Sequence, residues 1–326
     1  MKTEVLRMLK ESDGYLSGQE ICEKFHVSRT AVWKVIKQLE AEGYSIEAVR
    51  NKGYRLSGAG DILSRAELLS SMSTEWAGRN LLYFDETDST NTAAKRAAEE
   101  GAPHGTLAVA DYQSMGKGRR GRSWDAPHGV GIWMSIMCRP RLHPSCASML
   151  TLVAALAVAD GIQKTCGLTA QIKWPNDIVV NGKKVCGILT EMSTELECIN
   201  YVVTGIGINA NTEEFPEEIR QVATSLFLET GKRIRRSEVI SAVMASYERY
   251  YALFMEHENM KGLLEEYNSR LANLDNQVRV LAPENEYTGT ALGIDEMGEL
   301  LVKKENGEVT KVLSGEVSVR GIYGYV

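Results

Sequence analysis

The seven residues 116–122, Gly-Lys-Gly-Arg-Arg-Gly-Arg, constrain the fold more than any other stretch of this chain. Three glycines allow positive φ and a close approach of the backbone to a ligand, and they disfavour a regular helix or strand. Four neighbouring cations repel one another unless an anion lies among them. We therefore predict a loop that binds a phosphate or a similar anion; a solvated basic loop is the alternative. The glycine spacing matches neither a P-loop nor the G-x-G-x-x-G pattern.

The composition is that of a globular protein with more than one domain. Its 326 residues are enough for two or three domains, and 44% hydrophobic residues support a sizeable core. The net charge of −6 argues against a general nucleic-acid binder, but residues 1–58 carry ten Lys and Arg against eight Asp and Glu, a net charge of +2. This uneven charge is compatible with a DNA-binding domain at the N-terminus, followed by an acidic rest of the chain.

The cysteine and histidine patterns argue against the common metal and disulfide frameworks. The six cysteines contain no C-x-x-C pair, and the five histidines contain no H-x-x-x-H pair. The N-terminus lacks an apolar signal core, and the longest apolar run, around residues 150–159, is too short to span a bilayer. We therefore expect a protein of a reduced, cytoplasmic compartment.

The first 60 residues have the pattern of a winged helix-turn-helix. Apolar residues near the N-terminus predict a first helix. A capping box formed by Ser17 and Glu20 predicts the start of a second helix, and Ser28 predicts the start of a third. Apolar residues of the third helix recur at i, i+3, i+4 and i+7, which predicts one buried face. Residues 44–49 and 54–56 then alternate like two strands joined by a tight turn. Residues 57–61 have the composition of a linker.

The opposite face of the third helix and the turn between the two strands predict DNA binding. They combine hydrogen-bonding groups, a flat ring and positive charge, as base and phosphate contacts require. The predicted DNA-binding residues are Ser28, Arg29, Thr30, Trp33, Lys34, Lys37, Arg50 and Lys52. A small helical protein–protein module is the alternative.

Strand and helix patterns are mixed from about residue 62 onward. Strands are expected at residues 81–84, 106–113, 131–137, around 172–180, at 183–189 and at 201–209, and a core helix at 147–164. The basic loop lies between two strands, a common position for functional loops. Ser89, Thr90 and Asn91 either cap the following helix or present polar groups to a ligand. Glycines in the last strand indicate close packing of a ligand or of a helix.

The order of the polar motifs resembles one family. The motifs are Ser-Thr-Asn at 89–91, Gln113, the basic loop, Lys-Trp-Pro-Asn-Asp at 173–177, Lys-Val-Cys-Gly-Ile-Leu at 184–189 and Gly-Ile-Gly-Ile-Asn at 205–209. Together they resemble the biotin–protein ligases. With the winged helix in front, essentially the whole chain resembles the bifunctional bacterial form, which is also the biotin operon repressor.

The resemblance implies an α+β, multidomain fold. Its parts are a winged helix-turn-helix over residues 1–60, a mixed α/β catalytic domain of the class II synthetase-like type over 61–272, and an SH3-like β barrel over 273–326. The C-terminal residues agree with the last part, because short strand patterns at 278–281, 287–292, 300–302, 309–313 and 317–320 are separated by turns.

The resemblance also implies a two-step reaction. The biotin carboxylate attacks the α-phosphate of ATP and gives biotinyl-5′-AMP and pyrophosphate; the ε-amine of a carrier lysine then attacks the mixed anhydride. Positioned cations stabilise the charge of the first step, and Mg²⁺ bridges the ATP phosphates without a protein cage of its own. The implied partners are the biotin carboxyl carrier protein of acetyl-CoA carboxylase, operator DNA and, with adenylate bound, a second copy of the chain.

Individual roles follow from the same resemblance. Arg119 and Lys173 are the expected catalytic residues. Biotin binding is expected from Ser89, Thr90, Asn91, Gln113, Lys117, Gly118, Arg119, Lys173, Gly205 and Gly207, and adenylate binding from Arg119, Arg122, Trp124 and Asn209. The two glycines would give the biotin rings room, and Trp124 would close the loop over the intermediate. Lys117 departs from the family pattern, which usually has arginine there, and lacks the bidentate fork of arginine.

Two other functions fit parts of the pattern. A lipoate or octanoate ligase shares the fold and the acyl-adenylate chemistry, but the winged helix and the arginine-glycine loop disfavour it. A non-enzymatic regulator that binds an adenylate only as an effector is disfavoured by the presence of Arg119 and Lys173.

Overall fold

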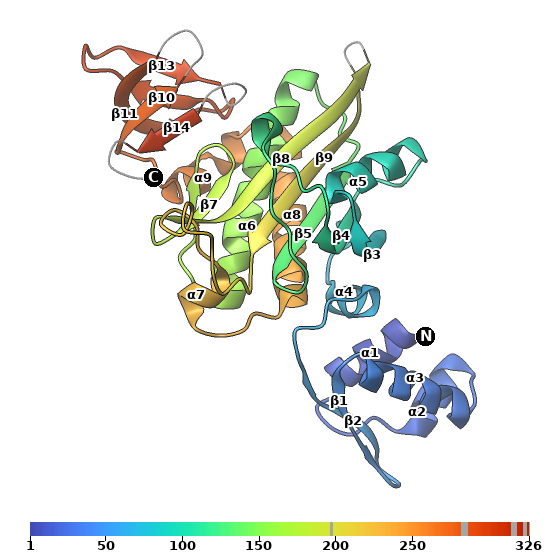
Figure 1. Ribbon diagram of the computed structural model, residues 1–326. Helices are drawn as coiled ribbons and strands as arrows, with labels where there is room; N and C mark the ends of the chain where they lie inside the picture. Colours follow the sequence, from blue (N-terminus) through green and yellow to red (C-terminus); the bar gives the residue numbers. More distant parts are fainter. Residues whose placement is uncertain (196–197, 282–285, 314–317, 322–324, 326) are drawn as a thin grey trace. The chain divides into compact units, whose positions relative to one another are not determined.

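The computed structural model describes residues 1–195, 198–281, 286–313, 318–321 and 325. The contacts divide the chain into two compact units. Residues 1–73 and 235–241 form the N-terminal unit, and residues 74–234 and 242–326 form the large unit. Figure 1 shows the elements of both.

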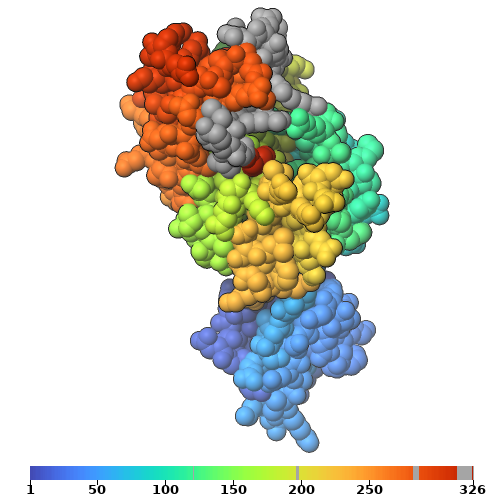
Figure 2. Space-filling view, turned by 60° about the vertical axis from the view of Figure 1, so that its left-hand side comes forward, coloured from blue at the N-terminus to red at the C-terminus, as the bar shows by residue number. Residues whose placement is uncertain are grey.

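The N-terminal unit contains three helices followed by a hairpin, as predicted. Its elements are α1 (Lys2–Glu11), α2 (Gly18–Phe25), α3 (Arg29–Ala41), β1 (Tyr44–Val49), β2 (Gly53–Ala59) and α4 (Arg65–Ser71). The predicted apolar face of α3 is buried against Val5, Leu6 and Leu9 of α1. The β1–β2 hairpin pairs antiparallel and projects from its unit as a narrow finger in Figure 2.

Two local predictions for this unit need correction. Ser17 accepts a hydrogen bond from the backbone N of Gln19 at 3.2 Å, so the cap bond does not go to Glu20 as a capping box requires. The predicted linker is mostly strand, because β2 continues through Ala59. Asp61, the last residue of the predicted linker, forms an ion pair of 2.7 Å with Arg236, and their side chains are only 3% and 4% exposed.

The large unit is built on one mixed sheet of order β3-β4-β5-β9-β8-β7-β6. Its strands are β3 (Leu81–Thr87), β4 (Thr106–Gln113), β5 (Gly131–Cys138), β6 (Gln171–Lys173), β7 (Asp177–Val180), β8 (Lys183–Glu195) and β9 (Cys198–Asn209). Only the β3–β4 pair of this sheet is parallel. The predicted Asn-Gly turn joins β7 to β8, with φ of 50° at Asn181 and 76° at Gly182.

Helices cover both faces of this sheet. Met137 of β5 packs with alanines of α5 (Thr90–Glu99), whereas the next residue, Cys138, lies 3.6 Å from the Tyr247 hydroxyl of α8 (Arg236–His257). Successive strand residues point to opposite faces, so α5 and α8 lie on opposite sides. The other helical segments are α6 (Leu150–Cys166), α7 (Leu226–Thr230), α9 (Leu264–Ser269), η1 (Arg119–Gly121), η2 (Pro144–Met149) and η3 (Lys261–Leu263).

The core helix differs from the sequence prediction at its start. Residues 144–149 form the 3-10 turn η2, and α6 begins at Leu150. The combined segment Pro144–Cys166 is as long and apolar as a membrane-spanning helix, but 78% of its most apolar stretch is buried inside the protein. A Cβ on Gly161 would lie 2.6 Å from Val243, so this glycine allows α6 and α8 to pack closely. The segment therefore has the burial of a core helix.

The C-terminal part is an antiparallel sheet of order β13-β12-β11-β10-β14. Its strands are β10 (Gln277–Leu281), β11 (Glu286–Ile294), β12 (Leu300–Lys303), β13 (Val309–Val312) and β14 (Ser318–Gly321). The predicted strands are present, except that Val317 lies outside the described residues. Trp174 connects this sheet to the β6–β7 turn, because its indole Nε1 donates to Gly298 O at 3.1 Å.

Candidate active site

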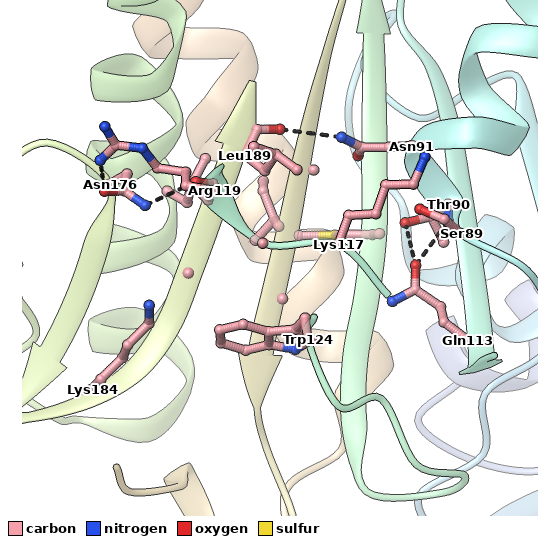
Figure 3. A pocket seen from close by; sticks show the side chains of 17 residues that line it. Ser89, Thr90, Asn91, Gln113, Lys117, Arg119, Trp124, Asn176, Lys184 and Leu189 are labelled. Atoms are coloured by element: carbon pink, nitrogen blue, oxygen red, sulfur yellow. Dashed lines mark hydrogen bonds between the residues drawn. The ribbon is translucent and has the colours of Figure 1, made fainter. Parts of the chain in front are cut away.

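A hollow with about 480 Å³ of empty space opens between the sheet, the start of α5 and the basic loop. Figure 3 shows it from close by. Its lining residues are Ser89, Thr90, Asn91, Gln113, Lys117, Gly118, Arg119, Trp124, Met134, Asn176, Lys184, Gly187, Ile188, Leu189, Gly205, Ile206 and Gly207. The hollow thus brings together polar groups from the α5 side and cations from the loop and from β8.

The α5 side of the hollow is a hydrogen-bonded set of polar groups. Gln113 Oε1 accepts from Thr90 N at 2.8 Å and from Thr90 Oγ1 at 3.0 Å. Because this oxygen is already bonded, the amide Nε2 is the atom with which Gln113 would donate to a ligand. Ser89 occupies the N-cap position, but its side chain makes no cap hydrogen bond. The structure therefore favours the ligand-facing alternative for Ser89 over the helix cap.

The Asn91 side chain forms hydrogen bonds with other groups of the protein. Its Nδ2 donates to Glu191 Oε2 at 2.7 Å and to Leu189 O at 3.3 Å, and its Oδ1 accepts from Ser135 Oγ at 2.6 Å. Burial alone would raise the pKa of Glu191, but hydrogen bonds from Lys95 and Asn91 hold that pKa below its ordinary value. Asn91 lines the hollow, and its amide is used to hold α5 against β8.

Three cations line the hollow. Arg119 Nη1 donates to Asn176 Oδ1 at 2.7 Å, Lys117 Nζ donates to Thr92 Oγ1 at 3.2 Å, and Lys184 Nζ lies 2.6 Å from Asp177 Oδ1. Convergent positive charge of this kind attracts an anionic substrate and stabilises charge that develops during a reaction.

Trp124 lies against two glycines of the sheet. A Cβ on Gly207 would lie 2.9 Å from its Nε1, and one on Gly187 would lie 2.9 Å from its Cζ3. A Cβ on Gly205 would lie 2.1 Å from Asn91 Oδ1. Both glycines line the hollow. The expectation that they make room for the rings of a ligand stays a prediction, and in this structure Asn91 and Trp124 lie against them.

The indole nitrogen of Trp124 is itself a candidate ligand contact. It is buried and has no hydrogen-bond partner among the residues that the structure describes. A buried N–H without a partner is costly, so an acceptor atom of a bound molecule would stabilise this position.

Three predicted site residues lie outside the lining of the hollow. Lys173, 6% exposed, has its Nζ 3.3 Å from the ring centroid of Tyr325. Arg122 is exposed, and its carbonyl accepts from Gly118 N at 2.7 Å. Asn209, 8% exposed, donates from Nδ2 to Thr224 O at 3.1 Å. This bond ties the end of β9 to the segment that contains Thr224.

The sequence prediction missed several lining residues. They are Met134, Asn176, Lys184, Gly187, Ile188, Leu189 and Ile206. Asn176 and Lys184 fall inside the motifs at 173–177 and 184–189, so their residue types were visible. Their common position at the hollow was not visible, because it depends on how β7 and β8 pair.

The predicted DNA-binding residues form an exposed basic surface on the N-terminal unit. Arg29, Thr30, Lys34, Lys37, Arg50 and Lys52 are exposed, and Trp33 is 51% exposed. Ser28 has a structural role as the N-cap of α3, where it accepts from Ala31 N at 3.3 Å. Between α2, α3 and the hairpin lies a hollow of about 1030 Å³, which Arg29, Arg50 and Lys52 help to line.

Comparison with known proteins agrees with this architecture in all three parts. Residues 83–209 match the biotin/lipoate A/B protein ligase family, residues 2–55 match a helix-turn-helix domain, and residues 274–320 match the biotin protein ligase C-terminal domain. The chain is thus a ligase of the biotin and lipoate class with a helix-turn-helix domain in front.

Full-length relatives define the family more closely. The bifunctional ligase/repressor BirA of Bacillus spizizenii is 41% identical over 309 residues, which cover 94% of each chain. The bifunctional ligase/repressor BirA of Escherichia coli is 29% identical and covers 93% of this chain and 92% of its own. The chain belongs to this family of bifunctional biotin ligase/repressors.

A solved structure extends the likeness to three dimensions. The biotin protein ligase of Aquifex aeolicus in complex with biotin and ATP superposes with a TM-score of 0.65 at 34% identity. The match covers 74% of this chain and 99% of the Aquifex chain. The shared ligase fold is therefore present here.

Proposed function

We propose that the large unit joins biotin to a lysine of a biotin carboxyl carrier protein at the expense of ATP. A biotin carboxylate oxygen attacks the α-phosphorus, the bond to the β-phosphate oxygen breaks, and pyrophosphate leaves. The carrier ε-amine then attacks the carbonyl carbon of biotinyl-5′-AMP, and AMP leaves with the electrons of the broken C–O bond. The observation that carries this proposal is the convergence of Lys117, Arg119 and Lys184 on a hollow that also holds hydrogen-bonding groups from the start of α5.

The chemistry of biotin suits the α5 side of the hollow. Ser89, Thr90 and Gln113 are our candidates for its ureido group, which needs directional donors and acceptors. Asn91 and Gly205 would support that set from behind, since they contact each other.

The cationic side of the hollow suits the carboxylate and the phosphates. Arg119 and Lys184 line it directly, and Lys117 and Gly118 belong to the same loop. Arg122 and Lys173 would act once the loop closes over ATP, with Trp124 excluding water from the adenylate. Asn209 stays a proposed adenylate contact, and its bond to Thr224 O holds it at the end of β9. These roles are proposals, and each predicts a loss of adenylate retention when the group is removed.

Mg²⁺ is expected to bind through the ATP phosphates, where it would neutralise their charge.

The N-terminal unit is proposed to repress biotin synthesis genes by binding operator DNA through α3 and the hairpin. The exposed cations on both elements support phosphate contacts. Two copies on a two-fold operator would require a homodimer when adenylate is bound. Sedimentation with and without biotin and ATP tests this, since an unchanged mass would argue against the adenylate-linked dimer.

Three finer features also stay proposals. We expect the C-terminal sheet to close as an SH3-like barrel and domain limits of 1–60, 61–272 and 273–326. A cytoplasmic location is supported by six cysteines that form no disulfide.

Biotin-dependent exchange of pyrophosphate into ATP tests the central proposal, because it reports adenylate formation without a carrier. Exchange is expected with biotin and not with lipoate. Exchange with lipoate alone would assign a lipoate ligase, and no exchange with either would assign a non-enzymatic regulator.

A further inference from the structure

Tyr325, near the C-terminal end of the chain, contacts the segment that joins β6 to β7. Its ring centroid lies 3.3 Å from Lys173 Nζ, and its hydroxyl donates to Asp177 Oδ2. Lys173 ends β6 and Asp177 begins β7, so the tyrosine touches both sides of this turn. Tyr325 and Asp177 are 148 positions apart in the sequence.

These contacts continue into the hollow through Asp177. Its Oδ1 lies 2.6 Å from Lys184 Nζ and accepts from Asn176 Nδ2 at 3.3 Å. Asn176 Oδ1 in turn accepts from Arg119 Nη1 at 2.7 Å. Two cations that line the hollow, Lys184 and Arg119, are therefore connected to the Tyr325 hydroxyl through one carboxylate.

The physical consequence concerns the direction of these cations. Asp177 receives hydrogen bonds on both oxygens, and its orientation sets where Lys184 and Asn176 point. The face of the Tyr325 ring carries partial negative charge and attracts the Lys173 ammonium, which is buried and needs such compensation. Without the tyrosine, the carboxylate can rotate and the cations lose a fixed position, which matters because electrostatic stabilisation depends on preorganisation.

We propose that Tyr325 is a positioning residue for the reaction with ATP. Its hydroxyl fixes Asp177 and through it Lys184 and Arg119, and its ring fixes Lys173. The proposal rests on the ligase function proposed above and adds to it a part for the C-terminal end of the chain, which acts on the phosphate-binding cations without touching the substrate.

Two substitutions separate the two contacts. Tyr325→Phe keeps the ring over Lys173 and removes only the hydroxyl, whereas Tyr325→Leu removes both. Tyr287→Leu is the matched control, because Tyr287 of β11 also has a lysine over its ring, Lys304 at 4.9 Å, and does not line the hollow.

The measurement is biotin-dependent pyrophosphate exchange by the full chain, with kcat and the KM values for ATP and biotin determined separately. Loss of one charge-assisted hydrogen bond should lower kcat/KM for ATP by about tenfold in Tyr325→Phe and further in Tyr325→Leu. The KM for biotin should change less than the KM for ATP, because Ser89, Thr90 and Gln113, the candidates for the ureido group, are unaffected. Tyr287→Leu should equal the wild type.

A purely structural role would lower the melting temperature of the variants while the folded fraction kept its kcat/KM for ATP. If wild type exchanges and both Tyr325 variants stay within about twofold of it, the positioning role is wrong and the ligase function stands. If Tyr325→Leu does not fold, Tyr325→Phe alone decides by the same criterion. Wild type without biotin-dependent exchange would refute the ligase proposal and this inference together.

Discussion

Replacing Gly205 by alanine tests whether the polar side of the hollow is as tightly built as its contacts indicate. The new Cβ would lie 2.1 Å from Asn91 Oδ1 and 2.9 Å from Asn91 Cγ. Asn91 cannot move aside without breaking its bonds to Ser135 at 2.6 Å and to Glu191 at 2.7 Å. The substitution therefore forces either β9 or α5 to shift.

The cost follows from two contributions. Inserting a methyl group into a packed interior costs about 1–3 kcal/mol, and losing one buried hydrogen bond adds about 1 kcal/mol. We expect Gly205→Ala to lower the free energy of unfolding by about 2–4 kcal/mol. For a unit of this size the melting temperature should fall by about 4–16 °C. Biotin affinity should fall as well, because Asn91 holds the start of α5 beside Ser89 and Thr90.

Calorimetry measures this change in the thermal transition that biotin shifts upward, since a ligand stabilises the unit that binds it. Gly262→Ala is the control in the same unit, because its Cβ would have no neighbour closer than 3.4 Å, an ordinary contact. A Gly205→Ala transition within about 1 °C of both wild type and control would show that Asn91 yields freely, and the reasoning would fail.

Other expected outcomes concern the cations, the DNA surface and acid stability. Arg119→Ala should release biotinyl-5′-AMP faster, measured as dissociation of labelled adenylate, and Asn176→Ala should have the same effect to a smaller degree; unchanged release would exclude a phosphate-binding role. Lys34→Ala and Lys37→Ala should each weaken operator binding and reduce its salt slope by about one, without changing pyrophosphate exchange; anisotropy titrations at several salt concentrations measure this, and an unchanged slope would remove the residue from the interface. The lowered pKa of Glu191 means that its ionised form stabilises the fold above its ordinary value of 4.5, and that this contribution is lost as the pH falls toward the lower folded-state value. Denaturation of Glu191→Gln should therefore depend less on pH than that of wild type in this acidic range; parallel curves would contradict the assignment.

Local sequence patterns were sufficient for most elements of the fold. Ser28 begins α3 because its hydroxyl meets a backbone N–H only three positions later. The Asn181–Gly182 turn follows from the positive φ that these two residue types tolerate. Such features depend on neighbours in the chain, so they can be recognised without tertiary structure. Three local predictions differ from the structure. The Ser17 cap bond goes to Gln19, β2 continues to Ala59 through pairing with β1, and the core helix begins at Leu150 after a 3-10 turn.

The sequence by itself determined the order of the elements, the basic loop and the residue types around the hollow. Only the tertiary structure decided which of these residues meet. Trp124 fills the gap at Gly207, Lys184 joins Arg119 at the hollow, and Lys173 faces Tyr325. The physical reason is that these contacts join residues far apart in the chain, and strand register and packing select one partner among many of similar chemistry.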